Sequence, residues 1–215
     1  MQDHLLANRY ALLGHLGRGS DGNVSLAQDR WSGTYLAVKA PFRRTEYTLL
    51  QTIRHPQVPT CYGRCKEKGR TYLIMEWIDG VPLWEYLVQK EIIDIEEATR
   101  MFTDLCSIFQ MLEEQEPPIV YADLHPGNVL RTADGRIKLI DFGRAYRVPR
   151  QRYEQIGARI LCTFVDYYFL PFLERGATRR LATTWCEEWH RRLGRPGTTR
   201  VDDLASSWQH LAHSF

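Results

Sequence analysis

The 215-residue sequence predicts an α+β fold with a β-rich N-terminal lobe and a helical C-terminal lobe. Two observations predict it. Short runs of alternating apolar and polar residues fill the first third of the chain, as is typical of half-buried strands. After residue 94, apolar residues recur at steps of three and four, the spacing of an amphipathic helix. A linker near 77–81 separates the patterns, so we expect lobes at 1–77 and 78–215 of one domain.

The N-terminal lobe is expected to contain five antiparallel strands and one helix. The runs YALLGHL and NVSLAQDR read as strands joined by GRGSDG, and WSG turns the chain into a third strand, TYLAVKA. The stretch PFRRTEYTLLQTIR predicts a short helix, with Pro41 allowed in its first turn. TCYGRCK and RTYLIMEW then predict a hairpin around EKG.

The C-terminal lobe is expected to begin with a long helix. Asp94 can cap this helix, with Glu97 as its third residue, and Pro117 and Pro118 stop it. The runs IVY and NVL predict short strands on either side of a polar stretch, and ADG turns the chain into a further strand, RIKLI. Beyond residue 150 we expect mostly helices.

The bulk composition indicates a soluble globular protein, with 44% hydrophobic and 25% charged residues. The longest apolar run, LCTFVDYYFLPFL, is too short to span a bilayer, and the first residues lack a signal-peptide core. Five cysteines without a Cys-x-x-Cys motif favour a reduced, cytoplasmic chain. The pairs Cys61–Cys65 and Cys186–His190 each lack a second pair at ligand spacing, so metal binding there is not favoured.

Positive charge is concentrated in residues 144–200, which hold 12 Arg, no Lys and 5 acidic residues, for a net +7. Residues 1–143 carry a net charge of −3. A solvated positive face is the favoured interpretation. The alternative is a docking surface for an acidic or phosphorylated partner, with nucleic acid as a less favoured partner.

Two stretches of the N-terminal lobe suggest phosphate chemistry. GRGSDGNV, from Gly17 to Val24, lies between two strands, so its glycines cap a hairpin that could lower backbone N–H groups onto a polyphosphate. Lys39 lies on an otherwise apolar strand and needs a partner for its charge, for which Glu46 is a candidate. The ordinary alternatives are a flexible hairpin loop and an exposed edge lysine.

Two further stretches, YADLHPGNVL and DFG, place Asp123, Asn128 and Asp141 beside short strands. Carboxylate and amide oxygens are hard ligands, and two or three of them near a nucleotide suffice for Mg²⁺. For the first stretch, an ordinary turn rich in turn-forming residues is the alternative.

In their order and spacing these stretches resemble the motif set of the protein-kinase superfamily: a glycine-rich loop, a strand lysine, a helix glutamate, an aspartate with an asparagine five residues later, and Asp-Phe-Gly. The resemblance covers residues 9–143, and small single-domain bacterial serine/threonine kinases match best overall. The form DLHPGNVL is similar to the RIO-like and aminoglycoside-phosphotransferase-like groups.

The resemblance implies a two-lobed kinase-like fold with a truncated C-terminal lobe, and an ATP- and Mg²⁺-dependent protein serine/threonine kinase. Asp123 would accept or orient the substrate hydroxyl. His125, at the family's lysine position, would donate a hydrogen bond to the transferred phosphoryl group, and the alternative is a histidine that packs within the loop. Asn128 and Asp141 would hold Mg²⁺. The implied ATP-binding residues are Gly17, Gly19, Gly22, Val24, Ala37, Lys39, Glu46, Met75, Glu76, Trp77 and Leu130.

Departures from the family pattern leave alternatives open. Ala122 replaces the arginine that normally receives an activation-loop phosphate, so we expect constitutive activity. A small-molecule hydroxyl kinase of the aminoglycoside- or choline-kinase type is favoured by His125 and the short C-terminal lobe. A nucleotide-binding pseudokinase scaffold is disfavoured, because every charged or amide residue of the motif set is present.

Overall fold

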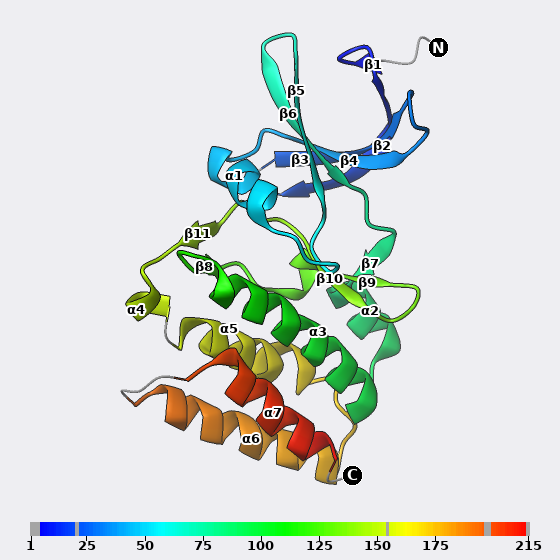
Figure 1. Ribbon diagram of the computed structural model, residues 1–215. Helices are drawn as coiled ribbons and strands as arrows, with labels where there is room; N and C mark the ends of the chain where they lie inside the picture. The colour runs from blue at the N-terminus through cyan, green and yellow to red at the C-terminus, as the bar shows by residue number, and fades with distance from the viewer. Residues whose placement is uncertain (1–4, 20–21, 154, 196–198, 214–215) are drawn as a thin grey trace. The chain divides into compact units, whose positions relative to one another are not determined.

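The computed structural model describes residues 5–19, 22–153, 155–195 and 199–213. The chain divides into two compact units (Figure 1). The first unit extends to Asp79 and also includes Asp141–Arg144, and the second comprises Gly80–Ile140 and the chain from Ala145 onward. Strands dominate the first unit and helices the second, so the predicted α+β fold class is confirmed.

The first unit is built on a six-stranded antiparallel sheet with the order β1-β2-β3-β4-β6-β5. All five strands that the sequence predicts are present in it. The sequence pattern missed β1, because two residues are too few to show an alternation. The strands are β1 (Leu5–Leu6), β2 (Tyr10–Gly19), β3 (Gly22–Asp29), β4 (Tyr35–Ala40), β5 (Cys61–Glu67) and β6 (Arg70–Glu76).

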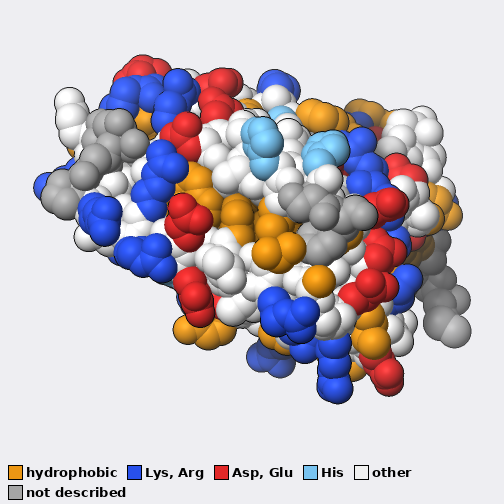
Figure 2. Space-filling model, turned by 90° about the horizontal axis from the view of Figure 1, so that it is seen from below, with side chains coloured by type: hydrophobic (Ala, Val, Ile, Leu, Met, Phe, Trp, Pro, Cys, Tyr) orange, Lys and Arg blue, Asp and Glu red, His pale blue; other side chains and the backbone are white. Residues whose placement is uncertain are grey.

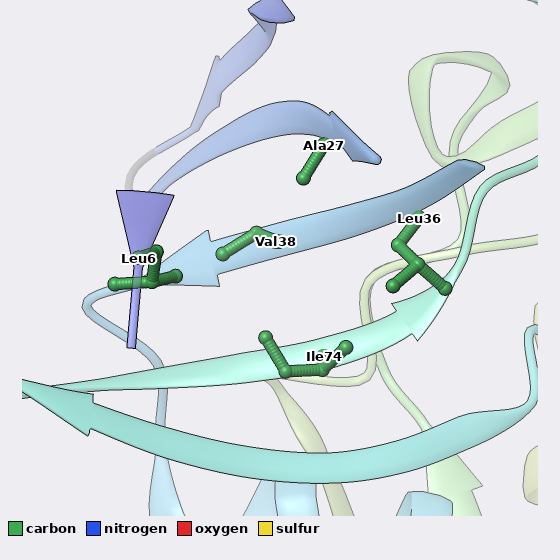
Figure 3. Close-up of a cluster of buried hydrophobic side chains, with 5 residues drawn as sticks. All are labelled: Leu6, Ala27, Leu36, Val38 and Ile74. Carbon is green, nitrogen blue, oxygen red and sulfur yellow. The ribbon is translucent and has the colours of Figure 1, made fainter. Parts of the chain in front are cut away.

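The two faces of this sheet differ in chemistry. One face carries a buried apolar cluster of Leu6, Ala27, Leu36, Val38 and Ile74, which come from four different strands (Figure 3). Successive side chains of a strand point to opposite faces, so the residues between these lie on the other face. Lys39 on β4 is one of them, and its partner in the ladder is Val24 on β3.

The helix of the first unit, α1 (Arg44–Thr52), is shorter than predicted. Arg43 has an extended backbone, with φ −81° and ψ 139°, so the first helical residue is Arg44. Pro41 therefore precedes the helix, and the prediction that Pro41 lies in its first turn is wrong. The helix buries Glu46, Leu49 and Leu50.

The long helix of the second unit, α3 (Ile95–Glu114), confirms the prediction made from its apolar spacing. The Asp94 carboxylate caps it by accepting a hydrogen bond of 2.7 Å from the backbone N–H of Glu97. Its ten buried residues include Met101, Phe102 and Phe109. This helix is the centre around which the rest of the second unit packs.

The expected linker is partly a strand, β7 (Gly80–Pro82), and a helix, α2 (Leu83–Lys90), follows it. β7 pairs with β9 (Val129–Thr132), which pairs in turn with β10 (Ile137–Leu139). The sequence pattern did not predict β7, because Gly80 and Pro82 are typical of turns. The buried Glu97 carboxylate ties α2, α3 and β9 together, because it accepts from Tyr86 and pairs with Arg131.

The polar stretch lies between the two predicted short strands. β8 (Ile119–Tyr121) pairs with β11 (Ala145–Arg147), and a single 3-10 turn, η1 (Pro126–Asn128), leads into β9. The predicted strands IVY, NVL and RIKLI correspond to β8, β9 and β10.

Beyond residue 150 the described residues are mostly helical, as expected. Its elements are α4 (Arg150–Tyr153), α5 (Ile156–Phe164), a π-helical turn η2 (Val165–Phe169), α6 (Ala177–Leu193) and α7 (Val201–Ala212). Three aromatic rings join α3, α6 and α7: the Trp208 ring centroid lies 5.1 Å from that of Phe102 and 4.9 Å from that of Trp185. The buried Trp208 indole donates to the Thr99 hydroxyl over 3.0 Å.

Several arginines of residues 144–200 bond to main-chain carbonyls of the same chain. Arg159 donates to the carbonyl of Leu193 at the end of α6, and Arg179 donates to that of Leu173. In Figure 2, Lys and Arg side chains are interspersed with Asp and Glu side chains around hydrophobic ones. Part of the arginine excess therefore ties loops and helix ends together.

Within the described ranges, none of the helices combines the length and the apolar composition that crossing a bilayer requires.

The aromatic cluster generates a stability prediction. We expect Trp208→Ala to lower the free energy of unfolding by about 3–5 kcal/mol, because it removes a large buried side chain and leaves a cavity. The indole bond to Thr99 is lost as well. Urea unfolding followed by circular dichroism measures this change. Gln209→Ala, at the next and exposed position of α7, should change it by less than about 0.5 kcal/mol. Equal effects of the two substitutions would contradict the packing described.

Candidate active site

A buried cation lies on the face of the sheet opposite the apolar cluster. The Lys39 side chain is 2% exposed, and its Nζ lies 2.8 Å and 3.0 Å from the two carboxylate oxygens of Glu46. The same nitrogen lies 2.8 Å from Oδ1 of Asp141. Strand β4, helix α1 and the Asp-Phe-Gly segment thus each supply one member of this charge cluster, which we call the lysine cluster.

The electrostatic balance of the lysine cluster favours the charged form of Lys39. Burial on its own lowers the pKa of this lysine, but the carboxylates of Glu46 and Asp141 together outweigh burial, so the pKa is raised above its ordinary value of 10.5. Lys39 is therefore a fixed cation held between two anions. The Glu46 side chain is 1% exposed, whereas that of Asp141 is 30% exposed.

Asp141 has an unusual backbone that orients its carboxylate. Its φ is 60°, in the left-handed region that non-glycine residues seldom adopt. Oδ1 accepts from the backbone N–H of Gly143 over 3.0 Å, while the next residue, Phe142, is fully buried. Such a conformation persists only where its surroundings hold it, and it is frequent at functional sites.

The glycine-rich segment contains one glycine that packing requires. Gly22 has a φ of +150°, and a Cβ there would lie 2.1 Å from the carbonyl oxygen of Pro41. Gly19 pairs with Gly22 across the hairpin, and Gly17 pairs with Val24. The tip of the loop, Ser20 and Asp21, lies outside the described residues. The hairpin predicted from GRGSDGNV is confirmed.

Three predicted nucleotide-contacting residues share the sheet face of Lys39. Val24 is its ladder partner, and Ala37 lies two residues before it on β4 with Met75 of β6 opposite. Glu76 is the last residue of β6, and Trp77 follows it. The backbone N–H of Glu76 donates to the carbonyl of Thr60. The Trp77 ring contacts the Tyr35 ring, with the two centroids 5.8 Å apart.

In the second unit, the polar stretch forms a hydrogen-bonded loop. The Asn128 side-chain amide donates to the carbonyl oxygen of Asp123 over 3.0 Å and to its Oδ2 over 3.4 Å. The backbone N–H of Asn128 donates to the carbonyl of His125. These bonds bring Asp123 and Asn128 together and fix the direction of the Asp123 carboxylate.

His125 has a defined tautomer when it is neutral. Its Nδ1 accepts from the backbone N–H of Gly127 over 3.1 Å, so the proton of the neutral ring lies on Nε2, which is then a donor. A Cβ on Gly127 would lie 2.9 Å from Cε1 of this ring. Glycine at this position therefore allows the imidazole to lie against the backbone of its own loop.

Tyr121 links the end of β8 to the residue that precedes Asp-Phe-Gly. Its buried hydroxyl donates to the carbonyl of Ile140 over 2.5 Å, and the backbone N–H of Ile140 donates to the carbonyl of Asn128 over 2.9 Å. Ile140 is followed directly by Asp141 in the sequence. Sequence analysis did not assign this role to Tyr121, although a phenol on an otherwise apolar strand was a signal for it.

The structure thus gathers the predicted site residues in two groups. Lys39, Glu46 and Asp141 meet in the lysine cluster. Asp123, His125 and Asn128 belong to one loop of the second unit, and Leu130 lies on β9, which begins where that loop ends. The residues of the pair Cys186–His190 have other partners. The carbonyl oxygen of the buried Cys186 lies 3.9 Å from the Cys162 sulfur, and Nε2 of His190 lies 3.3 Å from Oδ2 of Asp166.

The lysine cluster generates a stability prediction. We expect Lys39→Met to lower the free energy of unfolding by about 3–5 kcal/mol, because it leaves the Glu46 carboxylate buried without its cation. The double variant Lys39→Met/Glu46→Leu should lose less than the sum of the single variants, by at least about 1 kcal/mol. Urea unfolding of the four proteins measures this coupling. Lys66→Met, at an exposed position of β5, is the control. Additive losses would show that the pair does not interact.

Comparison with known proteins identifies the family of this chain. Residues 10–165 match the family model for the protein kinase domain. Sperm motility kinase 2A of Mus musculus is 33% identical over an alignment of 153 residues, and the alignment covers 67% of this chain. Aurora kinase B of Xenopus tropicalis is 25% identical over an alignment of 183 residues, with 80% of this chain covered. The probable serine/threonine-protein kinase PknB of Lactococcus lactis subsp. lactis is 28% identical over an alignment of 155 residues, with 66% of this chain covered.

These relatives are longer proteins. The aligned region makes up 30% of the sperm motility kinase, 49% of the aurora kinase and 24% of the bacterial kinase. The similarity therefore concerns a part of each relative. Because the family model covers well over half of this chain, the chain belongs to the protein kinase domain family.

Proposed function

We propose that this chain is an ATP- and Mg²⁺-dependent phosphotransferase that acts on serine or threonine hydroxyls of a protein. The observation that carries the proposal is the lysine cluster, a cation held by Glu46 and Asp141 on the sheet face beside the glycine hairpin. Residues 1–77 and 78–215 act as the two lobes of one kinase domain.

ATP binds against the sheet face that carries Lys39. The apolar side chains of Val24 and Ala37 contact the adenine from one side and Leu130 from the other, with Met75 at the back. Glu76 and Trp77 offer backbone hydrogen bonds to its edge. Lys39 neutralises charge on the α- and β-phosphates, and Glu46 keeps it in position. The hairpin glycines 17, 19 and 22 cover the phosphates with backbone N–H groups.

Asn128 and Asp141 are a donor set that suits Mg²⁺. One carboxylate and one amide oxygen, completed by phosphate oxygens and water, match the hard ligands that this ion prefers. When bound, Mg²⁺ supplies neutralisation of the phosphate charge.

Asp123 and His125 act on the acceptor. The hydroxyl oxygen of the acceptor bonds to the γ-phosphorus as the bond from that phosphorus to the bridging oxygen breaks, and ADP leaves. The proton of the hydroxyl passes to the Asp123 carboxylate, which the Asn128 amide orients. The Nε2–H of His125 donates to an oxygen of the transferred phosphoryl group and stabilises its charge.

A small-molecule hydroxyl kinase is the second candidate, because a histidine rather than a lysine follows the proposed base. The pseudokinase alternative conflicts with the presence of all five charged or amide groups. Cys106, Cys162 and Cys186 are buried free thiols, which supports a reducing, cytoplasmic location. An acidic or phosphorylated partner at the arginine-rich region remains a secondary proposal.

A transfer assay separates these candidates. The chain is incubated with ATP labelled in the γ-phosphate and with Mg²⁺, a basic test protein and a small-molecule extract. Label on the chain or the test protein supports a protein kinase, and label only in the extract supports the small-molecule candidate. Nucleotide binding without any turnover supports the pseudokinase.

Asp123→Asn tests the proposed base. We expect transfer to fall by about 10²–10⁴-fold, the usual contribution of a general base, while ATP affinity stays unchanged. Transfer of labelled phosphate and equilibrium binding of ATP are measured on the same preparation. Asp134→Asn, in the exposed turn between β9 and β10, is the matched control and should transfer like the wild type. Wild-type turnover in Asp123→Asn would remove this residue from the chemistry.

The replacement of the family's arginine by Ala122 generates a regulatory prediction. Without that arginine, a phosphate added after Asp-Phe-Gly lacks its usual partner, so activity should not depend on phosphorylation. Protein freed of phosphate by a phosphatase, as checked by mass spectrometry, should transfer at the rate of the untreated protein. A large loss that returns on rephosphorylation would refute constitutive activity.

A further inference from the structure

A groove of about 520 Å³ lies beside the catalytic loop of the second unit. Helix α2 forms one wall, the loop forms the base next to His125, and the segment at the end of η2 forms the other wall. All three parts belong to the second unit. Its lining residues are Trp84, Leu87, Val88, His125, Pro126, Gly127, Tyr168 and Phe172.

The groove is apolar, and the wall that α2 forms is open to solvent. Leu87 and Pro126 are buried, whereas Trp84 is 51% exposed and Val88 is 59% exposed. Single exposed apolar residues are ordinary, but these two lie on one side of α2 and line one groove. Covering an exposed apolar surface of this kind with an apolar group lowers the free energy of the system.

Hydrogen bonds and close packing hold the walls in place. The backbone N–H of Ile93 donates to the carbonyl of Phe172 over 2.8 Å, and that of Glu174 donates to the carbonyl of Ile93 over 3.1 Å. Tyr168 packs on Phe164, with the ring centroids 5.2 Å apart. The groove is therefore formed before any ligand arrives, which reduces the entropy cost of binding.

The lining determines which side chain fits. Among its residues in the described part of the chain, His125 alone is ionisable near neutral pH and none is a carboxylate. A lysine or arginine side chain would lose hydration there without gaining a partner for its charge. Aromatic rings on both walls favour an aromatic or branched aliphatic side chain, which can stack or pack between them.

Position along the chain connects the groove to the acceptor. Asp123, the proposed base, precedes His125 by two residues, so their Cα atoms lie within about 7 Å of each other. An extended peptide whose hydroxyl reaches Asp123 therefore places a side chain only a few residues away at the groove.

We propose that this groove selects protein acceptors by binding one aromatic or branched aliphatic side chain near the phosphorylated serine or threonine. The inference rests on the proposed function, because it takes Asp123 and His125 as the acceptor site. It goes further in naming the class of acceptor: a peptide with an apolar anchor rather than a basic one.

A peptide series tests this selectivity with the full chain. Each peptide holds one serine in an alanine-rich background, with Phe, Leu, Arg or Ala placed in turn at every other position. At one position near the serine, we expect Phe or Leu to raise kcat/KM about tenfold to a hundredfold over Ala, through a lower KM. Arg at that position should give no gain. Equal rates for all peptides would overturn the proposal.

Two lysine substitutions on α2 test where the selectivity arises. Val88→Lys introduces a charge into the groove wall, and Gln89→Lys introduces the same charge at the adjacent exposed position outside the lining. We expect the ratio of kcat/KM for the Phe and Ala peptides to fall toward one in Val88→Lys. The ratio should stay at its wild-type value in Gln89→Lys. A wild-type ratio in Val88→Lys would place the selectivity elsewhere and overturn the assignment.

Direct binding separates failure of this inference from failure of the proposed function. Fluorescence anisotropy with labelled Phe and Ala peptides, in the presence of ADP, needs no turnover. A Val88-dependent preference in binding without phosphoryl transfer would support the groove and overturn the enzymatic activity. No preference in binding or transfer would overturn the groove. A dimer that dissociates in Val88→Lys, detected by sedimentation, would identify a second copy as the occupant and overturn the peptide proposal.

Discussion

The rest of the site depends on one electrostatic constraint, the pairing of a buried ammonium group. Lys39 lies on a strand where its neighbours are apolar, and an unpaired charge at that depth would cost several kcal/mol. Glu46 and Asp141 satisfy it, and in doing so they fix α1 and the Asp-Phe-Gly segment relative to β4. Buried ion pairs are seldom worth more to stability than well-packed apolar side chains. The arrangement is therefore better explained by phosphate chemistry than by stability of the fold.

Hydrogen bonds also orient the loop side chains that we propose as catalytic. Asn128 bonds to both the carbonyl and the carboxylate of Asp123, and Gly127 sets the tautomer of His125. Tyr121 reaches across to the carbonyl of Ile140. Each contact restricts a rotamer, so the loop is arranged before a substrate binds. Such preorganisation supplies much of the electrostatic stabilisation in phosphoryl transfer, where the protein mainly positions groups and neutralises charge.

Sequence patterns predicted the elements whose signals are long or chemically distinct. Helix α3 has a regular apolar spacing over 20 residues and a capping aspartate. Glu46 was a candidate partner for Lys39 because a charge on an apolar strand needs neutralising, and the structure confirms the pair over an exposed edge lysine. Short elements were missed: β1 has two residues, and β7 has three, two of which are Gly80 and Pro82, and it is a strand because it pairs with β9. The sequence also did not predict which arginines bond to main-chain carbonyls. Bonds such as that from Arg159 to the Leu193 carbonyl join residues far apart in the sequence. For the same reason Tyr121 carried only a weak signal.

The contact between Gly22 and Pro41 has a consequence for how the hairpin moves. The atom that a methyl group at Gly22 would strike belongs to the main chain, so no rotation of a neighbouring side chain could relieve the collision. The end of the hairpin next to its turn thus lies close to the polypeptide that leads into α1. We therefore expect a displacement of the hairpin at Gly22 to displace the segment at Pro41. A molecule that pushes on the hairpin would then shift α1, the helix that carries Glu46.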